Sequence, residues 1–423
     1  MSETPTPGGP TSGAPGISAV LESLPFHREM VDYLKTQEEE LWKWFSSTAF
    51  LDEYAATTRL ELLKSCYRFD AADHPDLYEL VGAVGNRLGF SAPVTLYQSQ
   101  SSAGMNAALC YVPGEAHLVL EGPIRATLSV EELRAIVAHE LTHYLLWERQ
   151  DGELLVADQM LSAMVSHPRA EPSHFESARL FRLYLEVHCD RAALAICADP
   201  LVAISSLIKV QTGLVDAQAE GYLRQSDEIF GQAEIKTEGL THPETFIRAR
   251  ALKLWADRGA DANEEIARMI EGALELGRLS LVGQHRLTSL TRRLLARFLE
   301  PSWLRTDPIL AHARLFFPDL DLGAPVAPDV RPLKDDLASA TDSVRKYVGY
   351  VLLDLATVDG TLEQAPLAAA VCLSEDLEIS DAFLSLAGDE LELAKRALTR
   401  LKKESAKIVT GAGPSPTVDE SKS

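Results

Sequence analysis

The sequence lacks any run of apolar residues close to the roughly 20 that a membrane-spanning helix needs. Its most apolar stretches, residues 154–165 and 347–358, are interrupted by Asp158 and Asp354. Residues 1–18 also lack the basic start and the apolar middle that are typical of a signal peptide. We therefore expect a cytoplasmic protein with no transmembrane segment.

Basic side chains and paired cysteines are also scarce. Lys and Arg number 40 against 62 Asp and Glu, a net charge of -22, which argues against nucleic acid as a main partner because phosphate binding needs a basic surface. The five cysteines include no C-x-x-C pair, so they indicate reduced thiols and not a disulfide framework. What remains is a globular composition, 46% hydrophobic and 24% charged over 423 residues, long enough for two or three domains.

The most informative stretch is an H-E-x-x-H pattern, His139-Glu140-Leu141-Thr142-His143, inside a predicted helix. Ser129 and Glu132 have capping-box spacing ahead of it, and the apolar residues that follow form a core stripe: Leu133, Ile136, Val137, Leu141, Tyr144 and Leu145. On a helix, His139 and His143 project from one face and can bind one zinc ion. Glu140 can then accept a proton from a water at the metal. The alternative is a chance match on an ordinary amphipathic helix.

A catalytic zinc site of this kind needs a third ligand and one position left for water. The metzincin pattern is excluded, because Leu146 and Arg149 stand where that pattern has Gly and His. A carboxylate from a later helix is the remaining source.

Glu186 and Asp190 supply such carboxylates. They are four residues apart in a largely apolar helical segment and therefore share one face. We predict that Glu186 binds the metal and that Asp190 accepts a hydrogen bond from the outer ring N–H of a ligating histidine. His188, about 200° round the helix from Glu186, is the less favoured ligand. The alternative is a pair of surface acids beside two arginines, Arg182 and Arg191.

Four segments in this order resemble one family. They are Asn106-Ala107 with the strand-like residues 116–120, the H-E-x-x-H helix, Glu186-x-x-x-Asp190-x-x-Ala193, and Thr241-His242-Pro243 with Arg248. Together they resemble the HtpX and CAAX-prenyl-endopeptidase group of zinc metallopeptidases over roughly residues 30–255. Well-known members of that group are integral membrane proteins, and this chain differs from them in lacking an apolar spanning segment.

The resemblance implies a mainly α (α+β) fold, with a zincin-like domain that contains a small β-hairpin or edge sheet. It implies that Asn106 and Ala107 line the substrate cleft and that His242 is a catalytic residue that stabilises the oxyanion. Arg248 would form a structural ion pair. The residues alone leave other roles open, because Asn106 also suits an ordinary turn and His242 an ordinary loop.

Local patterns add an expected order of elements. Helices are expected at about 27–48, 50–67 and 74–88, a strand at 94–97, and a hairpin from 107–111 and 117–120. Local patterns together with the resemblance divide the chain into six expected segments: 1–18 disordered, 19–255 zincin-like metallopeptidase domain, 256–317 helical extension, 318–332 linker, 333–407 helical domain and 408–423 disordered tail.

The last helical segment resembles the TerB (tellurite-resistance) domain in its Asp359-Gly360 followed by Glu363. Asp354, Asp359 and Glu363 could bind a divalent cation or could cap a helix end, and the sequence leaves both open. The match is short and carries no further assignment.

These observations predict a zinc-dependent metalloendopeptidase that acts on a peptide or protein substrate. One Zn²⁺ would be held by His139, His143 and Glu186, with Glu140 as the general base. The alternative is a zinc-bound latent peptidase or scaffold that acts by binding a protein partner through its helical C-terminal domain. An intact Glu140 argues against a pure scaffold, which has no use for a base.

Overall fold

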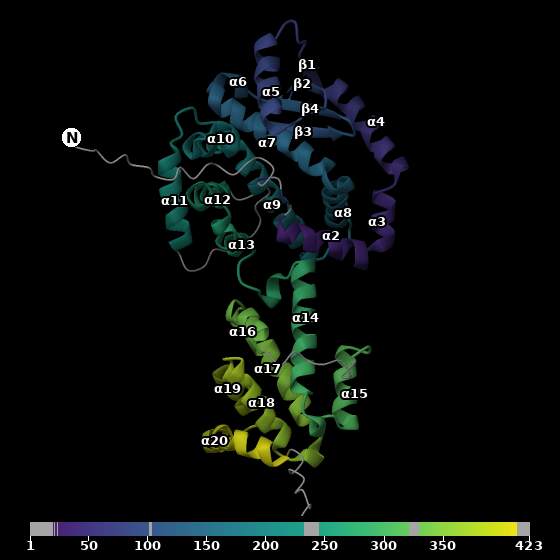
Figure 1. Ribbon diagram of the computed structural model, residues 1–423, viewed down its shortest axis with the longest axis vertical. Helices are drawn as coiled ribbons and strands as arrows, with labels where there is room; N and C mark the ends of the chain where they lie inside the picture. Colours follow the sequence, from purple (N-terminus) through teal and green to yellow (C-terminus); the bar gives the residue numbers. More distant parts are fainter. Residues whose placement is uncertain are drawn as a thin grey trace, which may run out of the picture. The chain divides into compact units, whose positions relative to one another are not determined.

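The computed structural model describes residues 20, 22, 24–100, 104–231, 245–320 and 330–412. The chain divides into two compact units, Met1–Gly272 and Ala273–Ser423. Helices dominate both units, and the described residues form one four-stranded sheet in the first (Figure 1), which confirms the expected mainly α, α+β class. The boundary falls within the stretch 256–317 that the sequence indicated as a helical extension. The predictions for residues 1–18, for His242 and for the end of the tail concern residues outside those described.

The first unit contains the sheet and the helices around it. Its helices are α2 (Pro25–Gln37), α3 (Glu39–Phe45), α4 (Thr48–Ser65), α5 (Pro75–Leu88), α6 (Ile124–Thr127), α7 (Val130–Glu148), α8 (Glu153–Ser166), α9 (Pro172–Cys197), α10 (Pro200–Thr212), α11 (Ala219–Gly231), α12 (Thr245–Arg258) and α13 (Asn263–Glu271). Its strands are β1 (Cys66–Arg68), β2 (Val94–Ser99), β3 (Asn106–Val112) and β4 (Glu115–Glu121).

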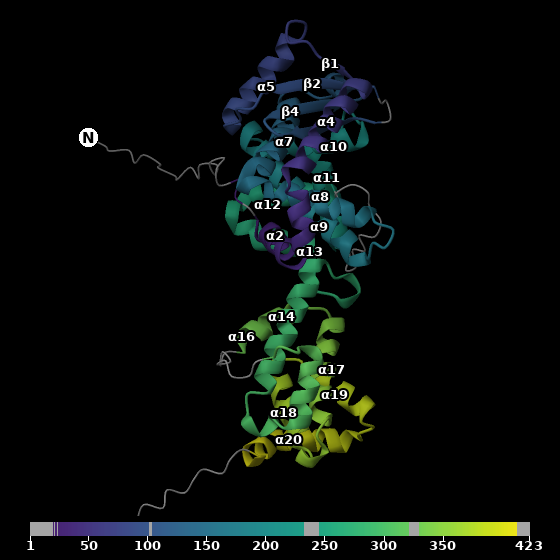
Figure 2. The same ribbon diagram turned by 90° about the vertical axis from the view of Figure 1, so that its right-hand side faces the viewer.

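The sheet has the strand order β1-β2-β4-β3, so β3 is an edge strand. The predicted hairpin is confirmed: β3 and β4 pair antiparallel, with Val112 opposite Glu115 across a tight turn where Gly114 has φ 79°. The pairing of β2 with β4 is parallel. Figures 1 and 2 show α7 beside the sheet, and α7 packs against both strands of the hairpin. The edge strand therefore lies next to the H-E-x-x-H helix.

One local prediction is wrong at its end. The helical pattern expected to reach Tyr67 stops at Ser65, and Cys66–Arg68 forms β1, which pairs antiparallel with β2. The ladder partners of these three residues lie about thirty positions later in the chain, beyond the reach of a local pattern.

The H-E-x-x-H helix α7 begins as expected. Ser129 Oγ accepts the Glu132 backbone N–H at 3.3 Å and the Glu132 carboxylate accepts the Ser129 N–H at 2.8 Å, a complete capping box. Lys209, from α10, pairs with the buried Glu132 at 2.8 Å. Helix α7 packs along α9, and α9 in turn contacts α8 and α12. This packing brings residues of α7, α8, α9 and α12 to one cleft.

A buried histidine joins the N-terminal helix to α9. His27 on α2 is 0% exposed, its Nε2 lies 3.2 Å from the Phe181 carbonyl oxygen, and its ring packs against those of Phe181 and Tyr184. Burial lowers the pKa of His27 to about 4, although the hydrogen bond to Phe181 opposes this. The imidazole is therefore neutral in the folded protein at neutral pH.

His27 should make the fold sensitive to mild acid. Because its folded pKa lies below the ordinary 6.5, the unfolded chain binds the proton more readily, and stability falls as the pH drops from 6.5 towards 4. Between pH 7 and pH 5 this one group should cost about 2 kcal/mol. His27→Gln keeps a donor for Phe181 and should lose correspondingly less stability over that interval, as measured by urea unfolding with tryptophan fluorescence. The exposed His167→Gln is the control, and equal losses in the wild type and His27→Gln would contradict the assignment.

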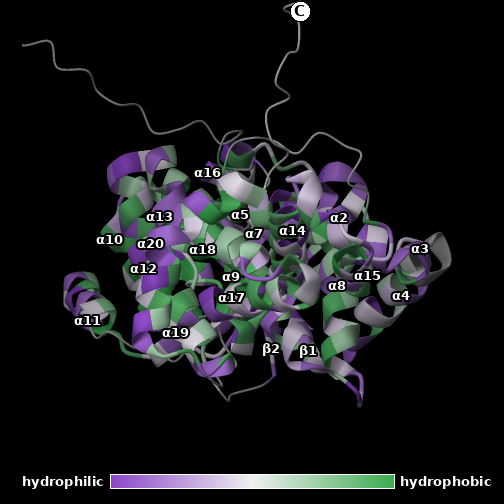
Figure 3. Cartoon of the chain, turned by 90° about the horizontal axis from the view of Figure 1, so that it is seen from below, coloured by the Kyte–Doolittle hydropathy of each residue, from purple (hydrophilic) through white to green (hydrophobic). Residues whose placement is uncertain are grey.

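The second unit is a helical bundle with its own core. Its helices are α14 (Leu281–Phe298), α15 (Asp307–Phe316), α16 (Arg331–Ala338), α17 (Asp342–Thr357), α18 (Ala365–Asp376), α19 (Ser380–Glu390) and α20 (Lys395–Ala412). One apolar cluster runs from Leu290 on α14 to Leu401 on α20. Figure 3 shows α20 largely in the hydrophilic colour, because most of its side chains other than Leu401 and its neighbours on the buried face are polar or basic.

Asp359, which follows α17, caps the turn after that helix. Asp359 is buried, and its Oδ1 accepts the Thr361 backbone N–H at 3.0 Å and the Thr361 hydroxyl at 2.6 Å. Asp354 and Glu363 are exposed. Within the described ranges, the groups of His, Cys, Asp and Glu close enough to hold an ion do not include these three residues. The capping alternative therefore accounts for Asp359.

Within the part of the chain that the structure describes, every helix is too short or too polar to span a lipid bilayer.

Candidate metal centre

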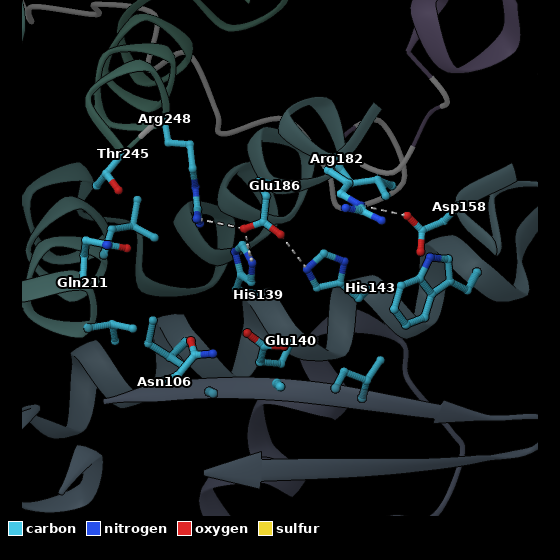
Figure 4. Close-up of a pocket in the computed structure, with 18 residues that line it drawn as sticks. Asn106, His139, Glu140, His143, Asp158, Arg182, Glu186, Gln211, Thr245 and Arg248 are labelled. Atoms are coloured by element: carbon cyan, nitrogen blue, oxygen red, sulfur yellow. Dashed lines mark hydrogen bonds and ion pairs between the residues drawn. The ribbon is translucent and has the colours of Figure 1, made fainter. Parts of the chain in front are cut away.

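Helices α7, α9 and α12 and strand β3 surround a cleft of about 370 Å³. His139, Glu140 and His143 reach it from α7, Glu186 from α9, Arg248 from α12, and the first residues of β3 form its lower wall in Figure 4. A volume of this size is ordinary for a ligand-binding pocket. All these elements belong to the first unit.

Two histidines and one carboxylate converge at the centre of the cleft. His139 Nε2 lies 3.4 Å from one oxygen of Glu186, and His143 Nε2 lies 3.4 Å from the other. Figure 4 shows both imidazoles directed towards the Glu186 carboxylate. Ligand atoms held tetrahedrally at zinc–ligand distances of 2.0–2.1 Å are spaced by about 3.4 Å. The donors present thus fit a zinc ion in chemical type, and each histidine–carboxylate separation matches this spacing, although the two separations involve different oxygens of Glu186.

Asp190 and Arg248 support this group from behind. Asp190 Oδ1 lies 2.9 Å from His139 Nδ1, which leaves Nε2 of the ring facing the cleft. The Arg248 guanidinium donates to both oxygens of Asp190, at 2.7 and 2.8 Å, and lies 2.8 Å from Glu186. The expected ion pair of Arg248 is confirmed. His188 points elsewhere, because its Nε2 contacts the Val20 carbonyl oxygen.

The charges of the cleft depend on one another. Burial opposes ionisation of Glu186 and Asp190, but Arg248 and the hydrogen bonds to the histidines outweigh it and hold the pKa of each acid below its usual range. Burial likewise lowers the pKa of His139, and the two acids outweigh it and raise that pKa to about 10. The metal-free pocket therefore holds a proton on His139 that a metal would have to displace.

Glu140 differs from Glu186 and Asp190. It is 8% exposed, and burial raises its pKa, although the nearby histidines and a hydrogen bond from the Leu109 backbone N–H oppose that shift. Its carboxylate lies on the β3 side of the histidine pair in Figure 4. A carboxylate with a raised pKa beside a metal site is suited to take up and release a proton near neutral pH.

Cys189 is a candidate ligand that the sequence analysis treated as a packing residue. Its thiol sulfur and one ring nitrogen each of His139 and His143 lie within 4.8 Å of one another, and all three residues are buried or nearly so. Burial raises the pKa of the Cys189 thiol well above its usual value. The sequence could have indicated Cys189 as a candidate ligand, because it follows Glu186 by three residues and therefore lies next to it on the same helix.

The edge strand forms the wall of the cleft opposite Glu186. Asn106 and Ala107, which the resemblance placed in the substrate cleft, both line it, together with Ala108 and Leu109. Asn106 is exposed and Ala107 is buried. The structure thus brings together every predicted site residue that it describes, and His242, which lies between α11 and α12 in the sequence, is outside the described residues.

Several lining residues were missed by sequence reasoning. Trp147 lies one turn after His143 on α7, Asp158 and Arg182 lie at one end of the cleft, and Gln211 and Thr245 lie at the other. Spacing alone could have indicated Trp147. The same spacing rule applies to Arg182, four residues before Glu186 on α9. Asp158, Gln211 and Thr245 reach the cleft only through the packing of α8, α10 and α12 around α7 and α9.

Comparison with known proteins finds one informative similarity. The chain is 29% identical over 201 residues to the plastoglobule-localized metallopeptidase 48, chloroplastic, of Arabidopsis thaliana. The aligned stretch covers 43% of this chain and 57% of that protein, so the chain spans little more than half of the relative's length. No protein-family model matches the sequence. No solved structure matches it.

Proposed function

We propose that the first unit is a zinc-dependent metalloendopeptidase of the HtpX-like type. The observation that carries the proposal is the pair of 3.4 Å separations between the Glu186 carboxylate and the Nε2 atoms of His139 and His143. Each separation equals the spacing between two ligand atoms of a tetrahedral zinc site, with one carboxylate oxygen facing each histidine. The similarity to a protein that is named a metallopeptidase supports the same class.

In this proposal His139, His143 and Glu186 hold the zinc ion. When bound, zinc polarises the scissile carbonyl and lowers the pKa of a water in its open position. Asp190 accepts a hydrogen bond from His139 Nδ1–H and so favours the tautomer whose unprotonated Nε2 can bind the metal. Arg248 keeps Asp190 and Glu186 ionised.

Glu140 is the general base and then the general acid. Its carboxylate takes a proton from the attacking water and returns it to the leaving amine. The outward-facing backbone of β3, including Ala107, can pair with an extended peptide, so the substrate is a peptide or protein segment bound largely through its main chain. Asn106 lies at the start of this wall and can orient the chain of the substrate. His242 is retained as a proposed oxyanion stabiliser from the resemblance alone.

The test uses the full-length chain. Zinc content is measured by mass spectrometry, and cleavage of an unstructured protein is followed before chelation, after chelation and after zinc is restored. We expect about one zinc per chain and cleavage that chelation abolishes and zinc restores. A chain that binds no zinc would refute the metal site, whereas a chain that binds zinc and cleaves nothing under any condition would refute the peptidase.

A further inference from the structure

The two candidate zinc-binding histidines are supported unequally. A histidine that binds zinc through Nε2 carries a proton on Nδ1, and that N–H needs an acceptor when it is buried. For His139 the acceptor is Asp190, 2.9 Å away. For His143 the Nδ1 atom is buried and has no hydrogen-bond partner among the residues that the structure describes. The second histidine therefore needs an acceptor that the group around Glu186 does not supply.

A second unsatisfied donor lies beside it. The His143 ring packs on the indole of Trp147, with ring centroids 5.5 Å apart and planes inclined by 31°. The Trp147 Nε1 atom is also buried, and no described residue forms a hydrogen bond with it. Both side chains line the cleft. Buried N–H groups are normally hydrogen-bonded, so each of these two groups calls for an acceptor from the cleft that both side chains line.

Asp158 is the acid that lines this end of the cleft. It projects from α8, its side chain is 25% exposed, and Figure 4 shows its carboxylate on the His143 side of the cleft, away from Arg248. Among the described residues its ion pair is with Arg182, at a long 3.4 Å, while Arg182 itself donates to Ser162 Oγ at 2.7 Å. A carboxylate offers about four acceptor positions. Asp158 can thus accept further hydrogen bonds, and the N–H groups of His143 and Trp147 are two donors at the same end of the cleft.

We propose that Asp158 is a positioning residue for His143, joined to its Nδ1–H through one bridging water that the Trp147 N–H can also reach. Asp158 then does for His143 what Asp190 does for His139, and Arg182 anchors Asp158 as Arg248 anchors Asp190. A water in a polar pocket with two to four partners is a stable bridge. This inference rests on the proposed zinc site. Burial raises the pKa of the Asp158 carboxyl, and Arg182 and, to a smaller extent, His143 oppose that rise.

The other use of Asp158 would be in substrate recognition. A half-buried acid at the end of a peptide cleft could bind a Lys or Arg side chain of the substrate. That role would act on substrate affinity and would leave zinc affinity unchanged, so the two roles are separable by measurement.

The experiment measures zinc affinity of the full chain by competition with a chromophoric chelator, with no substrate present. Asp158→Leu should weaken zinc binding by about 10–100-fold, the usual effect of removing an outer partner of a ligand. Asp158→Asn keeps an acceptor oxygen and should recover part of that loss. Glu153→Gln is the matched control, because it neutralises an acid on the same helix that pairs with Lys35 and does not line the cleft.

Each outcome has one meaning. Unchanged zinc affinity in both Asp158 variants would overturn the proposal, and an accompanying rise in KM confined to basic peptides would assign Asp158 to substrate recognition. A wild-type chain without zinc affinity would instead refute the zinc site itself. Thermal unfolding of the metal-free variants separates a loss of fold from a loss of positioning, because Asp158→Asn should unfold within a few degrees of the wild type.

Discussion

Replacing Glu140 with glutamine should lower kcat by about a thousandfold while the chain still binds about one zinc. Glutamine has nearly the same shape and can still accept the Leu109 backbone N–H, but it cannot take a proton from the attacking water. The raised pKa of the buried Glu140 carboxyl suits it to proton transfer near neutral pH, whereas Arg248 holds Glu186 and Asp190 ionised. The pKa of Asp158 is also raised, but that acid lies at the end of the cleft. The loss should therefore appear in turnover and not in metal content.

The measurement pairs zinc analysis with cleavage of an unstructured protein under saturating zinc. Glu131→Gln is the matched control: Glu131 is an exposed acid on the same helix, paired with Arg134 at 2.5 Å, and its loss should leave both readings unchanged. Full activity in Glu140→Gln would remove Glu140 from the mechanism. A wild type that holds zinc but cleaves nothing would favour the latent or scaffold alternative, in which the helical C-terminal part binds a partner.

The parts of the fold that were predictable are those with local causes. The Ser129 capping box, the buried stripe of α7 and the tight turn before Glu115 depend on residues within one or two turns of one another, and all three are present. The parallel pairing of β2 with β4 was not predictable, because its partners are about twenty residues apart and joined through a hairpin strand that lies at the edge of the sheet. Two parallel strands are not joined by a short turn, so the sequence contains no turn motif that would indicate their pairing.

The candidate site shows the same division. Glu186 and Asp190 were predictable because an acid pair on one face of an apolar helix needs a partner, and the geometry of that partner follows from the H-E-x-x-H helix. Asp158 was not predictable, because it enters the cleft through the packing of α8 against α9 and its own spacing carries no motif. Arg182 could have been found, since it precedes Glu186 by four residues on α9 and therefore shares its face. Cys189 was visible but ambiguous, since a thiol on a buried helix face suits packing as well as ligation. The role of the C-terminal unit, including its TerB-like resemblance, stays a prediction.

The identity of the third ligand leads to the second large expected effect. Glu186→Ala should weaken zinc binding by more than about a hundredfold, beyond what the loss of an outer partner causes. Cys189→Ser should leave zinc affinity unchanged. Geometry alone does not decide between the two ligands: each histidine nitrogen lies 3.4 Å from a different oxygen of Glu186, whereas among the described residues the group whose single ligand atoms lie within 4.8 Å of one another is His139, His143 and Cys189. The expectation rests on charge, because Arg248 holds Glu186 ionised while burial raises the pKa of the Cys189 thiol well above its usual value and so disfavours the thiolate that a metal binds.

Cobalt substitution decides between the two ligand sets without any reference to activity. A thiolate bound to Co²⁺ gives a strong charge-transfer absorption in the near ultraviolet, and a site of two histidines and a carboxylate does not. We expect the cobalt-loaded wild type and Cys189→Ser to have the same spectrum, with Cys197→Ser as the control for removing a thiol elsewhere on α9. A near-ultraviolet band that disappears only in Cys189→Ser would identify Cys189 as the ligand. Glu186 would then be, like Asp190, a carboxylate held by Arg248 that sets the charge of the site without touching the metal.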